Sequence, residues 1–387
     1  MKKRLLAFVL AVWTVAALVP YASASSAIKL VIDNKTVSSS VAPYAENGTT
    51  LVPLRVISEN LGADVLWNTP KKQATIQTAA YKVIFTIDSP KYTVNGVSKT
   101  LASPARLSGG STMVPIRAFA ESIGATVNYD SSTNTASIKY FTNMTGTLKI
   151  DGSTTVQPIA QDAADALMKM NTGLSISVSG GGSGTGITDA TKGTVNIGTS
   201  SRELTNTEMG TLFPYAVAND GIALIVNPSN PVTSLTSAQA ASIFLGKITN
   251  WKDVGGDNAP IVVTTRESGS GTRSTLEELL MAKTSVVSTA SPYASSALIK
   301  QAVAANKYSI GYDSIGYVDN SVKVVSLDGT KATSTTVINK TYLLSRELFC
   351  CTKGSATGLS AIFIDYLRSD DAQKNIVYKD GYVMLAE

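Results

Sequence analysis

The strand-to-helix junction that decides the fold reads IVVTTRESGSGTRS, from Ile261 to Ser274. Its apolar start predicts a strand, and the segment from Ser274 to Met281 predicts the helix that follows. The turn between them begins with Arg266, which is followed by serine, glycine and threonine. Apolar runs alternate with helical segments through residues 147–387, and this alternation indicates an α/β domain.

Three further strand-to-helix junctions, at residues 152–158, 180–186 and 197–202, are also rich in Ser, Thr and Gly. The first turn of a helix leaves backbone N–H groups without intrahelical partners, and the helix dipole adds partial positive charge there. Glycine lets the backbone approach a ligand, and hydroxyl groups donate hydrogen bonds without adding charge. Together these features predict a site for a tetrahedral oxyanion, with Arg266 as its cation.

Ordinary helix capping explains any one of these junctions equally well, because Ser and Thr are preferred N-cap residues. Four such junctions in one domain, one of them after an arginine, favour a shared anion site. The phosphate-loop and dinucleotide-binding glycine motifs do not occur at these turns, so nucleotide binding is disfavoured. A nucleophile elbow of the G-x-S-x-G type is also missing from the sequence.

The composition excludes several classes of function. The chain has no histidine, so Ser-His-Asp catalysis, Cys-His catalysis and His-ligated metal sites are excluded. The formal net charge is +5, and three of the positive charges lie at residues 2–4, so the rest of the chain is nearly neutral. A neutral body does not predict nucleic-acid binding. We expect no metal, no cofactor and no enzymatic activity.

Residues 147–387 resemble the phosphate-binding substrate-binding proteins of bacterial phosphate ABC transporters. The motifs that carry this resemblance are G-S-T-T-V-x-P, I-G-x-S-S-R-E-L, D-G-I-A-L-I-V-N, I-F-x-G-K-I-x-N-W and R-E-x-G-S-G-T-R. The resemblance implies a two-lobe α/β fold of the type II periplasmic-binding-protein (Venus flytrap) kind, with the anion clamped between the lobes. It places one lobe near residues 147–223 and 322–387, and the other near residues 224–321.

The resemblance also implies a set of phosphate contacts, with Ser153 and Ser200 as adjacent candidates. Some members of the family have an aspartate where Ser201 stands, and many have one where Ser268 stands. A carboxylate acceptor lets such a site reject sulfate, which has no proton to donate. We expect Asp220 to be a candidate for this missing acceptor. The implied ligand-binding residues are Ser153, Thr154, Thr155, Ser183, Ser200, Ser201, Arg266, Ser270, Gly271 and Thr272.

Residues 28–140 contain a duplicated unit. The segment GTTLVPLR at Gly48 to Arg55 recurs as GSTMVPIR at Gly110 to Arg117. A fixed offset of this kind marks a structural repeat. In each copy we expect a proline to open a helix, and Gly62 or Gly124 to end it in the left-handed conformation.

This duplicated unit resembles the copper amine oxidase N-terminal-like domain of secreted bacterial proteins and predicts a small α+β module. It has no His or Cys to hold copper, so we predict no metal in it. Arg55 and Arg117 are interpreted as tying each helix start to nearby carbonyl or carboxylate oxygens, with ligand binding as the alternative. We expect residues 141–146 to be a linker and residues 28–140 to contact a cell-envelope partner.

Residues 1–24 have the layout of a secretory signal peptide. Lys2 to Arg4 precede an apolar run from Leu5 to Val19, and Ala22 to Ala24 match a cleavage site. The apolar run is about 15 residues long, whereas a membrane span needs about 20. An uncleaved anchor is the alternative. We expect a secreted, extracytoplasmic protein that is associated with the cell surface.

The leading hypothesis is therefore a protein that captures inorganic phosphate, or a similar oxyanion, for an ABC transporter permease. A second hypothesis is a surface-attachment or matrix protein whose oxyanion site is relaxed or vestigial. A third is a phosphatase or other hydrolase, which the missing histidine and metal-ligand clusters disfavour.

Overall fold

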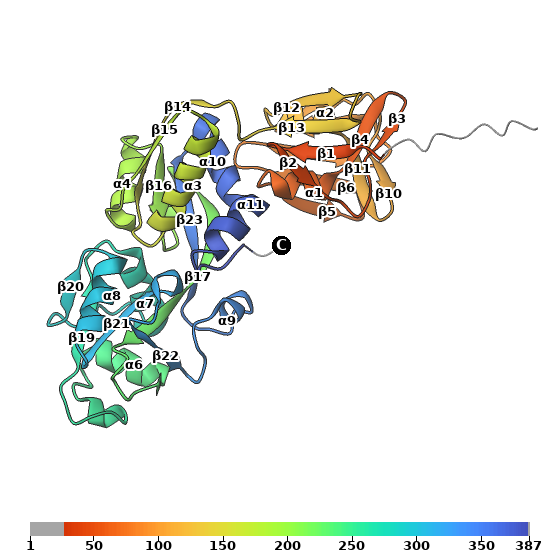
Figure 1. The fold of residues 1–387 in the computed structure, drawn as a ribbon. Helices are drawn as coiled ribbons and strands as arrows, with labels where there is room; N and C mark the ends of the chain where they lie inside the picture. The colour runs from red at the N-terminus through yellow and green to blue at the C-terminus, as the bar shows by residue number, and fades with distance from the viewer. Residues whose placement is uncertain (1–26, 386–387) are drawn as a thin grey trace, which may run out of the picture.

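The computed structural model describes residues 27–385, which form an N-terminal module and two lobes (Figure 1). The predicted signal peptide at residues 1–24 lies outside the described residues. Among the described residues, no helix has the length and apolar character needed to cross a membrane. The module lies beside one lobe and away from the other (Figure 1).

The two copies of the repeated unit fold alike. In each, a strand that ends in proline leads into a seven-residue helix, α1 (Leu54–Asn60) or α2 (Ile116–Ser122). Gly62 and Gly124 follow these helices with φ angles of 73° and 81°, so the predicted left-handed helix ends are present. The arginines after the prolines pair within their own helices, since Arg55 contacts Glu59 and Arg117 contacts Glu121, each at 3.1 Å.

Three small sheets build the module, and the repeats share strands between them. The first hairpin of the chain joins the second repeat, because β1 (Lys29–Ile32) pairs with β13 (Thr135–Lys139). The sheet orders are β12-β13-β1-β2, β10-β11-β4-β3 and β5-β6-β7-β8-β9. The other strands are β2 (Lys35–Val37), β3 (Tyr44–Glu46), β4 (Thr49–Pro53), β5 (Asp64–Asn68), β6 (Gln73–Gln77), β7 (Lys82–Thr86), β8 (Lys91–Val94), β9 (Val97–Thr100), β10 (Arg106–Ser108), β11 (Ser111–Pro115) and β12 (Thr126–Asp130).

Lobe 1 combines the start of the α/β region with the C-terminal end of the chain. Its strands lie in the order β15-β14-β16-β23-β17, and helices pack against them. The elements are β14 (Thr145–Gly152), α3 (Gln157–Met170), β15 (Gly173–Val178), α4 (Ser183–Lys192), β16 (Ile197–Ser200), α5 (Asn206–Met209), β23 (Ser345–Lys353), α10 (Gly358–Arg368), α11 (Asp370–Ala372) and η3 (Gln373–Tyr378).

Lobe 2 is formed by the middle of the α/β region around a separate apolar core. Its main strands continue the sheet in the order β17-β21-β19-β20. The elements are β18 (Ser234–Leu235), α6 (Ser237–Phe244), η1 (Trp251–Val254), β19 (Val262–Arg266), α7 (Gly271–Met281), β20 (Ser291–Tyr293), α8 (Ser296–Ala305), β21 (Ser309–Ser314), η2 (Ile315–Tyr317), β22 (Lys323–Leu327) and α9 (Ser334–Ile338).

One long strand, β17 (Leu212–Val226), connects the lobes. Its first part pairs with β23 in lobe 1, and residues 222–226 pair with β21 in lobe 2. The chain returns to lobe 1 along β23, later than the expected boundary at residue 322. That boundary needs correction because β22 pairs with residues 224–226 of β17 and with β18, which keeps it in lobe 2.

The segment expected to be a linker is packed against lobe 1. Tyr140, Phe141 and Met144 are all buried, and β14 already begins at residue 145. The Phe141 ring meets the ring of Tyr366 on α10 edge to face, with centroids 5.2 Å apart. A single apolar cluster runs from the module into lobe 1, so the two form one body.

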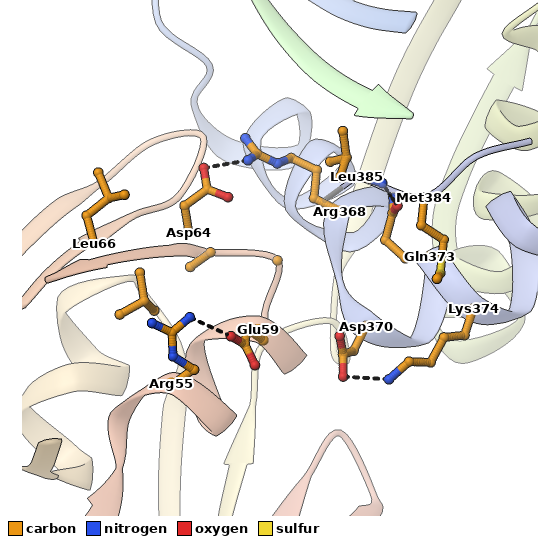
Figure 2. Close-up of a pocket in the computed structure, with 13 residues that line it drawn as sticks. Arg55, Glu59, Asp64, Leu66, Arg368, Asp370, Gln373, Lys374, Met384 and Leu385 are labelled. Atoms are coloured by element: carbon orange, nitrogen blue, oxygen red, sulfur yellow. Dashed lines mark hydrogen bonds and ion pairs between the residues drawn. The ribbon is translucent and has the colours of Figure 1, made fainter. Parts of the chain in front are cut away.

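Polar contacts fix the same interface. Asp365 on α10 is fully buried and accepts hydrogen bonds from the Ala79 N–H and the Tyr140 hydroxyl, each at 2.7 Å. A pocket of about 270 Å³ lies at the boundary, where Arg368 contacts Asp64 at 2.6 Å (Figure 2). At Gly62 an added Cβ would lie 1.8 Å from the Asp365 carbonyl oxygen, so α1 ends directly against the α10 backbone.

Candidate interlobe anion site

Lobe 1 brings its predicted residues together at the turns that precede α3 and α4 and follow β16. The hydroxyl oxygens of Ser183 and Ser201 lie 3.4 Å apart, and the Ser201 N–H donates to Ser183 Oγ at 3.1 Å. Thr154 and Thr155 occupy the turn before α3 and are buried, as are the two serines. Thus three separate turns contribute hydroxyl groups to one buried region.

Lobe 2 contributes the start of α7 and the end of β19. Ser270 caps α7 by accepting the Arg273 N–H at 3.4 Å, so Gly271 and Thr272 form the first turn of the helix. The first-turn N–H groups are electropositive because they have no intrahelical acceptor. Arg266 ends β19 and is only 2% exposed.

The two lobes touch through these predicted residues. Thr155 Oγ1 lies 3.1 Å from Thr272 Oγ1, and the Gly184 N–H donates to the Gly269 carbonyl at 2.9 Å. A Cβ added at Gly271 would lie 2.4 Å from Ser183 Oγ, so any larger residue would force this hydroxyl or the lobes to move. The junctions that the sequence analysis singled out therefore face each other across the lobe boundary.

Arg266 has partners on two sides. Its Nε and Nη2 atoms donate to the carboxylate of the neighbouring Glu267 at 3.0 and 2.9 Å. Its Nη1 atom donates to Ser296 Oγ at 3.2 Å. Glu267 therefore orients the guanidinium. It stands one position before Ser268, where many members of the family have an aspartate. The guanidinium has five N–H donors in all, so further donors remain for a ligand.

Ser296 contacts three of the predicted residues, Thr154, Thr155 and Arg266, but was not among them. It is fully buried at the first position of α8, and its N–H donates to Thr154 Oγ1 at 3.4 Å. Its hydroxyl oxygen also lies 3.5 Å from Thr155 Oγ1. The sequence does contain a signal for it, since Ser295 and Ser296 stand between a short strand and a helix, but no glycine or arginine marks that junction.

Three residues predicted at the site, Ser153, Ser200 and Asp220, make hydrogen bonds to other groups of the protein. The Ser200 hydroxyl donates to the Arg202 carbonyl, and the Ser153 hydroxyl accepts the Thr155 N–H, so both shape local turns. The carboxylate of Asp220 is occupied by the protein. Oδ2 accepts from Arg346 Nη2 at 2.7 Å, and Oδ1 accepts from the Ser314 hydroxyl at 2.7 Å. Asp220 therefore does not fill the role of an unpaired proton acceptor.

Within residues 27–385, no three side chains of the His, Cys, Asp and Glu types gather in a metal-binding arrangement. The features that converge between the lobes are neutral hydrogen-bond donors, the first turns of α4, α7 and α8, and the Arg266 guanidinium. Such a set binds a small anion through many directed donors and little net charge.

Comparison with known proteins assigns the chain to a family. The PBP superfamily domain matches residues 142–371. The phosphate-binding protein PstS of Bacillus subtilis is 34% identical over 258 residues, which cover 66% of this chain and 86% of that protein. The chain belongs to the PstS family of the PBP superfamily. The PstS of Borreliella burgdorferi is a further relative, 29% identical over 253 residues, covering 61% of this chain and 89% of its own.

Solved structures of PstS-like proteins share the two-lobe fold. A phosphate ABC transporter substrate-binding protein from Clostridium perfringens, solved with bound phosphate, is 39% identical with a TM-score of 0.60. A phosphate transport receptor from Vibrio cholerae is 36% identical with a TM-score of 0.54. Each match covers 62% of this chain and all of the other. The expected family and two-lobe fold are thus confirmed.

The N-terminal module lies outside residues 142–371, which the PBP superfamily domain matches. The copper amine oxidase N-terminal domain matches residues 31–138, which confirms the second resemblance. This PstS-family chain therefore joins a phosphate-binding-protein fold to a module of a different family, and the packed interface fixes the two together.

Proposed function

We propose that this chain captures inorganic phosphate between its two lobes and delivers it to an ABC transporter permease. The observation that supports the proposal most strongly is the convergence of Thr155, Ser183, Ser201, Thr272 and Arg266 at one buried interlobe position. Membership of the PstS family agrees with it. The ligand set proposed from sequence is retained with Ser296 added to it, and within that set Ser153 and Ser200 support the turns that present the other residues.

Binding rather than catalysis suits this chemistry. The site offers hydroxyl and amide donors around an anion but no nucleophile activated by a base. Phosphate has five heavy atoms, and a ceiling of roughly 1.5 kcal/mol per atom limits its binding free energy to ~7–8 kcal/mol. That limit corresponds to a Kd of about micromolar. Closure of the lobes contributes by removing water, which strengthens each hydrogen bond to the anion.

Isothermal titration of phosphate into the chain that starts near Ser25 tests the proposal. The full chain is needed because the module and lobe 1 share one core. We expect saturable binding of one phosphate per chain. Absence of binding heat, together with an unchanged melting temperature at millimolar phosphate, would favour the surface-attachment hypothesis instead.

We infer that the module contacts a cell-envelope partner and keeps the protein at the cell surface. Two features support this inference. The module packs on lobe 1 through the end of α1, and a pocket of about 620 Å³ lies between α2, β12 and the β3–β4 hairpin. Tyr129 on its wall is 43% exposed. Binding of the chain to isolated cell envelopes should decrease in a Tyr129→Asp variant, whereas phosphate binding should not change.

A further inference from the structure

Asp313 is a buried carboxyl group beside the proposed phosphate site, and it makes none of the contacts between the lobes described above. It lies on β21 opposite Ala223 of β17 and is 1% exposed. Its Oδ1 atom accepts the Ser314 N–H at 2.9 Å. Its Oδ2 atom is buried, and no hydrogen bond of ordinary geometry reaches it from any described residue. An unsatisfied oxygen of this kind is costly, so it calls for a functional explanation.

Among the groups around Asp313, one hydroxyl is able to donate a hydrogen bond to it. Burial raises the pKa of Asp313 to about 7. Among the groups that lower this pKa, the nearby Ser296 hydroxyl has the largest effect, and the charge of Arg266 has a smaller one. Tyr317 and Tyr382 also lie nearby, but their hydroxyls donate to the carbonyls of Thr154 and Thr155.

The charged groups nearby are already paired. Asp220 on β17 is held by Arg346 of β23, and it also accepts the Ser314 hydroxyl. Arg266 at the end of β19 is held by Glu267. Ser296 on α8 is therefore the polar side chain that links Asp313 to the proposed phosphate contacts.

The protonation state of Asp313 determines where the Ser296 hydrogen points. A serine hydroxyl has one hydrogen to donate and two lone pairs to accept with. Arg266 Nη1 uses one lone pair of Ser296. If the hydrogen points to Asp313, only a lone pair remains to face a ligand. If Asp313 carries its own proton, the serine hydrogen is free to point to the ligand instead.

We propose that Asp313 directs the Ser296 hydroxyl and thereby makes the site select a protonated oxyanion over a fully deprotonated one. The inference rests on the proposed function. With Asp313 ionised, Ser296 presents an acceptor, which hydrogen phosphate satisfies with its own O–H. Sulfate has no O–H, so its oxygen and the serine lone pair repel each other. Asp313 is thus a positioning residue that replaces the aspartate missing at position 201.

Titration of sulfate across pH tests this role, because sulfate keeps one charge state between about pH 5.5 and about pH 8.5. In the wild type, sulfate affinity should rise at least tenfold as the pH falls through the pKa of Asp313. The Asp313→Asn variant should bind sulfate at the higher level throughout the range. The Ser296→Ala variant should show no pH dependence. Melting temperatures of the ligand-free variants check that each one folds.

Two results would overturn the proposal. One is equal sulfate affinity of wild type and Asp313→Asn at every pH, including no binding by either. The other is a pH dependence that persists in Ser296→Ala, because the carboxylate would then act by its charge alone. A phosphate titration of the wild type at one fixed pH distinguishes failure of the Asp313 role from failure of the proposed function. If phosphate binds, either result rejects the role of Asp313 only, and if it does not, the proposed function itself fails.

Discussion

The hydroxyl oxygens of Thr155 and Thr272 lie 3.1 Å apart, although 117 positions separate the two residues in the chain. Thr155 belongs to the turn before α3 in lobe 1, and Thr272 belongs to the first turn of α7 in lobe 2. Two donors from different lobes can meet at this distance only when the lobes are together. Phosphate binding and lobe closure are therefore expected to be one event.

Substitution of Gly271 by alanine should weaken phosphate binding at least tenfold. The added Cβ would lie 2.4 Å from Ser183 Oγ and 2.7 Å from Ser201 Oγ, so the lobes would have to separate or the two hydroxyls would have to turn away. Calorimetric titration measures the change. Ser274→Ala, three residues along the same helix, serves as the control and should keep its affinity. Equal affinities of the two variants would argue against a closed site at Gly271.

Arg266→Ala should also weaken phosphate binding at least tenfold, since a hydrogen bond to a charged group contributes about 1.5–3 kcal/mol. Arg117→Ala removes the same charge from an exposed side chain of the module, and it should bind phosphate as the wild type does. Comparison of the two variants separates a direct contact from a change in net charge. Similar affinities in both would remove Arg266 from the site.

The module interface predicts different effects for the two equivalent glycines. Alanine at Gly62 or Gly124 must adopt the left-handed conformation, which costs roughly 1–2 kcal/mol at either position. At Gly62 the Cβ would also meet the Asp365 carbonyl, whereas at Gly124 the nearest atom is the Tyr81 hydroxyl at 3.8 Å. Gly62→Ala should therefore lower the melting temperature more than Gly124→Ala does. Equal decreases would show that the module does not pack on α10 as described.

Asp365 predicts a pH-dependent stability. Burial raises its pKa from 3.8 to about 7, so the folded chain holds this proton more tightly than the unfolded chain. Stability is therefore lost as the pH rises from about 4 through about 7. Asparagine imitates the neutral form, because its oxygen is able to accept the Ala79 N–H and its NH2 group is able to donate to Tyr140.

Asp365→Asn should melt above the wild type at about pH 8, and the difference should shrink toward about pH 5. Each kcal/mol corresponds to a shift of roughly 2–4 °C. The comparison of variant with wild type is necessary because burial raises the pKa of Asp313 in the same way. A difference that stays constant with pH would mean that Asp365 does not titrate in this range.

Local patterns in the sequence predicted most of the residues that meet between the lobes. Helix starts rich in Ser, Thr and Gly are recognisable because capping and close backbone approach require those residues, and Arg266 stands out in such a turn. Ser296 and Asp313 were missed for a physical reason. Their importance comes from what lies beside them in space, and neither the start of α8 nor the end of β21 carries a distinctive local pattern.

Long-range packing explains the other differences. The end of lobe 2 depends on which strand β22 pairs with, and pairing partners are not visible in the segment itself. The contact between Tyr140 and Asp365 joins residues 225 positions apart, so the residues around Tyr140 read as a linker although they are buried. The repeat, by contrast, was visible because both copies keep the same turn residues.

The most direct test is a crystal structure of the mature chain grown with phosphate. We predict one phosphate ion between the lobes, within hydrogen-bond distance of Thr155, Ser183 and Thr272 and of the Arg266 guanidinium. A phosphate ion bound elsewhere, with these four side chains at their present distances and no ion among them, would contradict it.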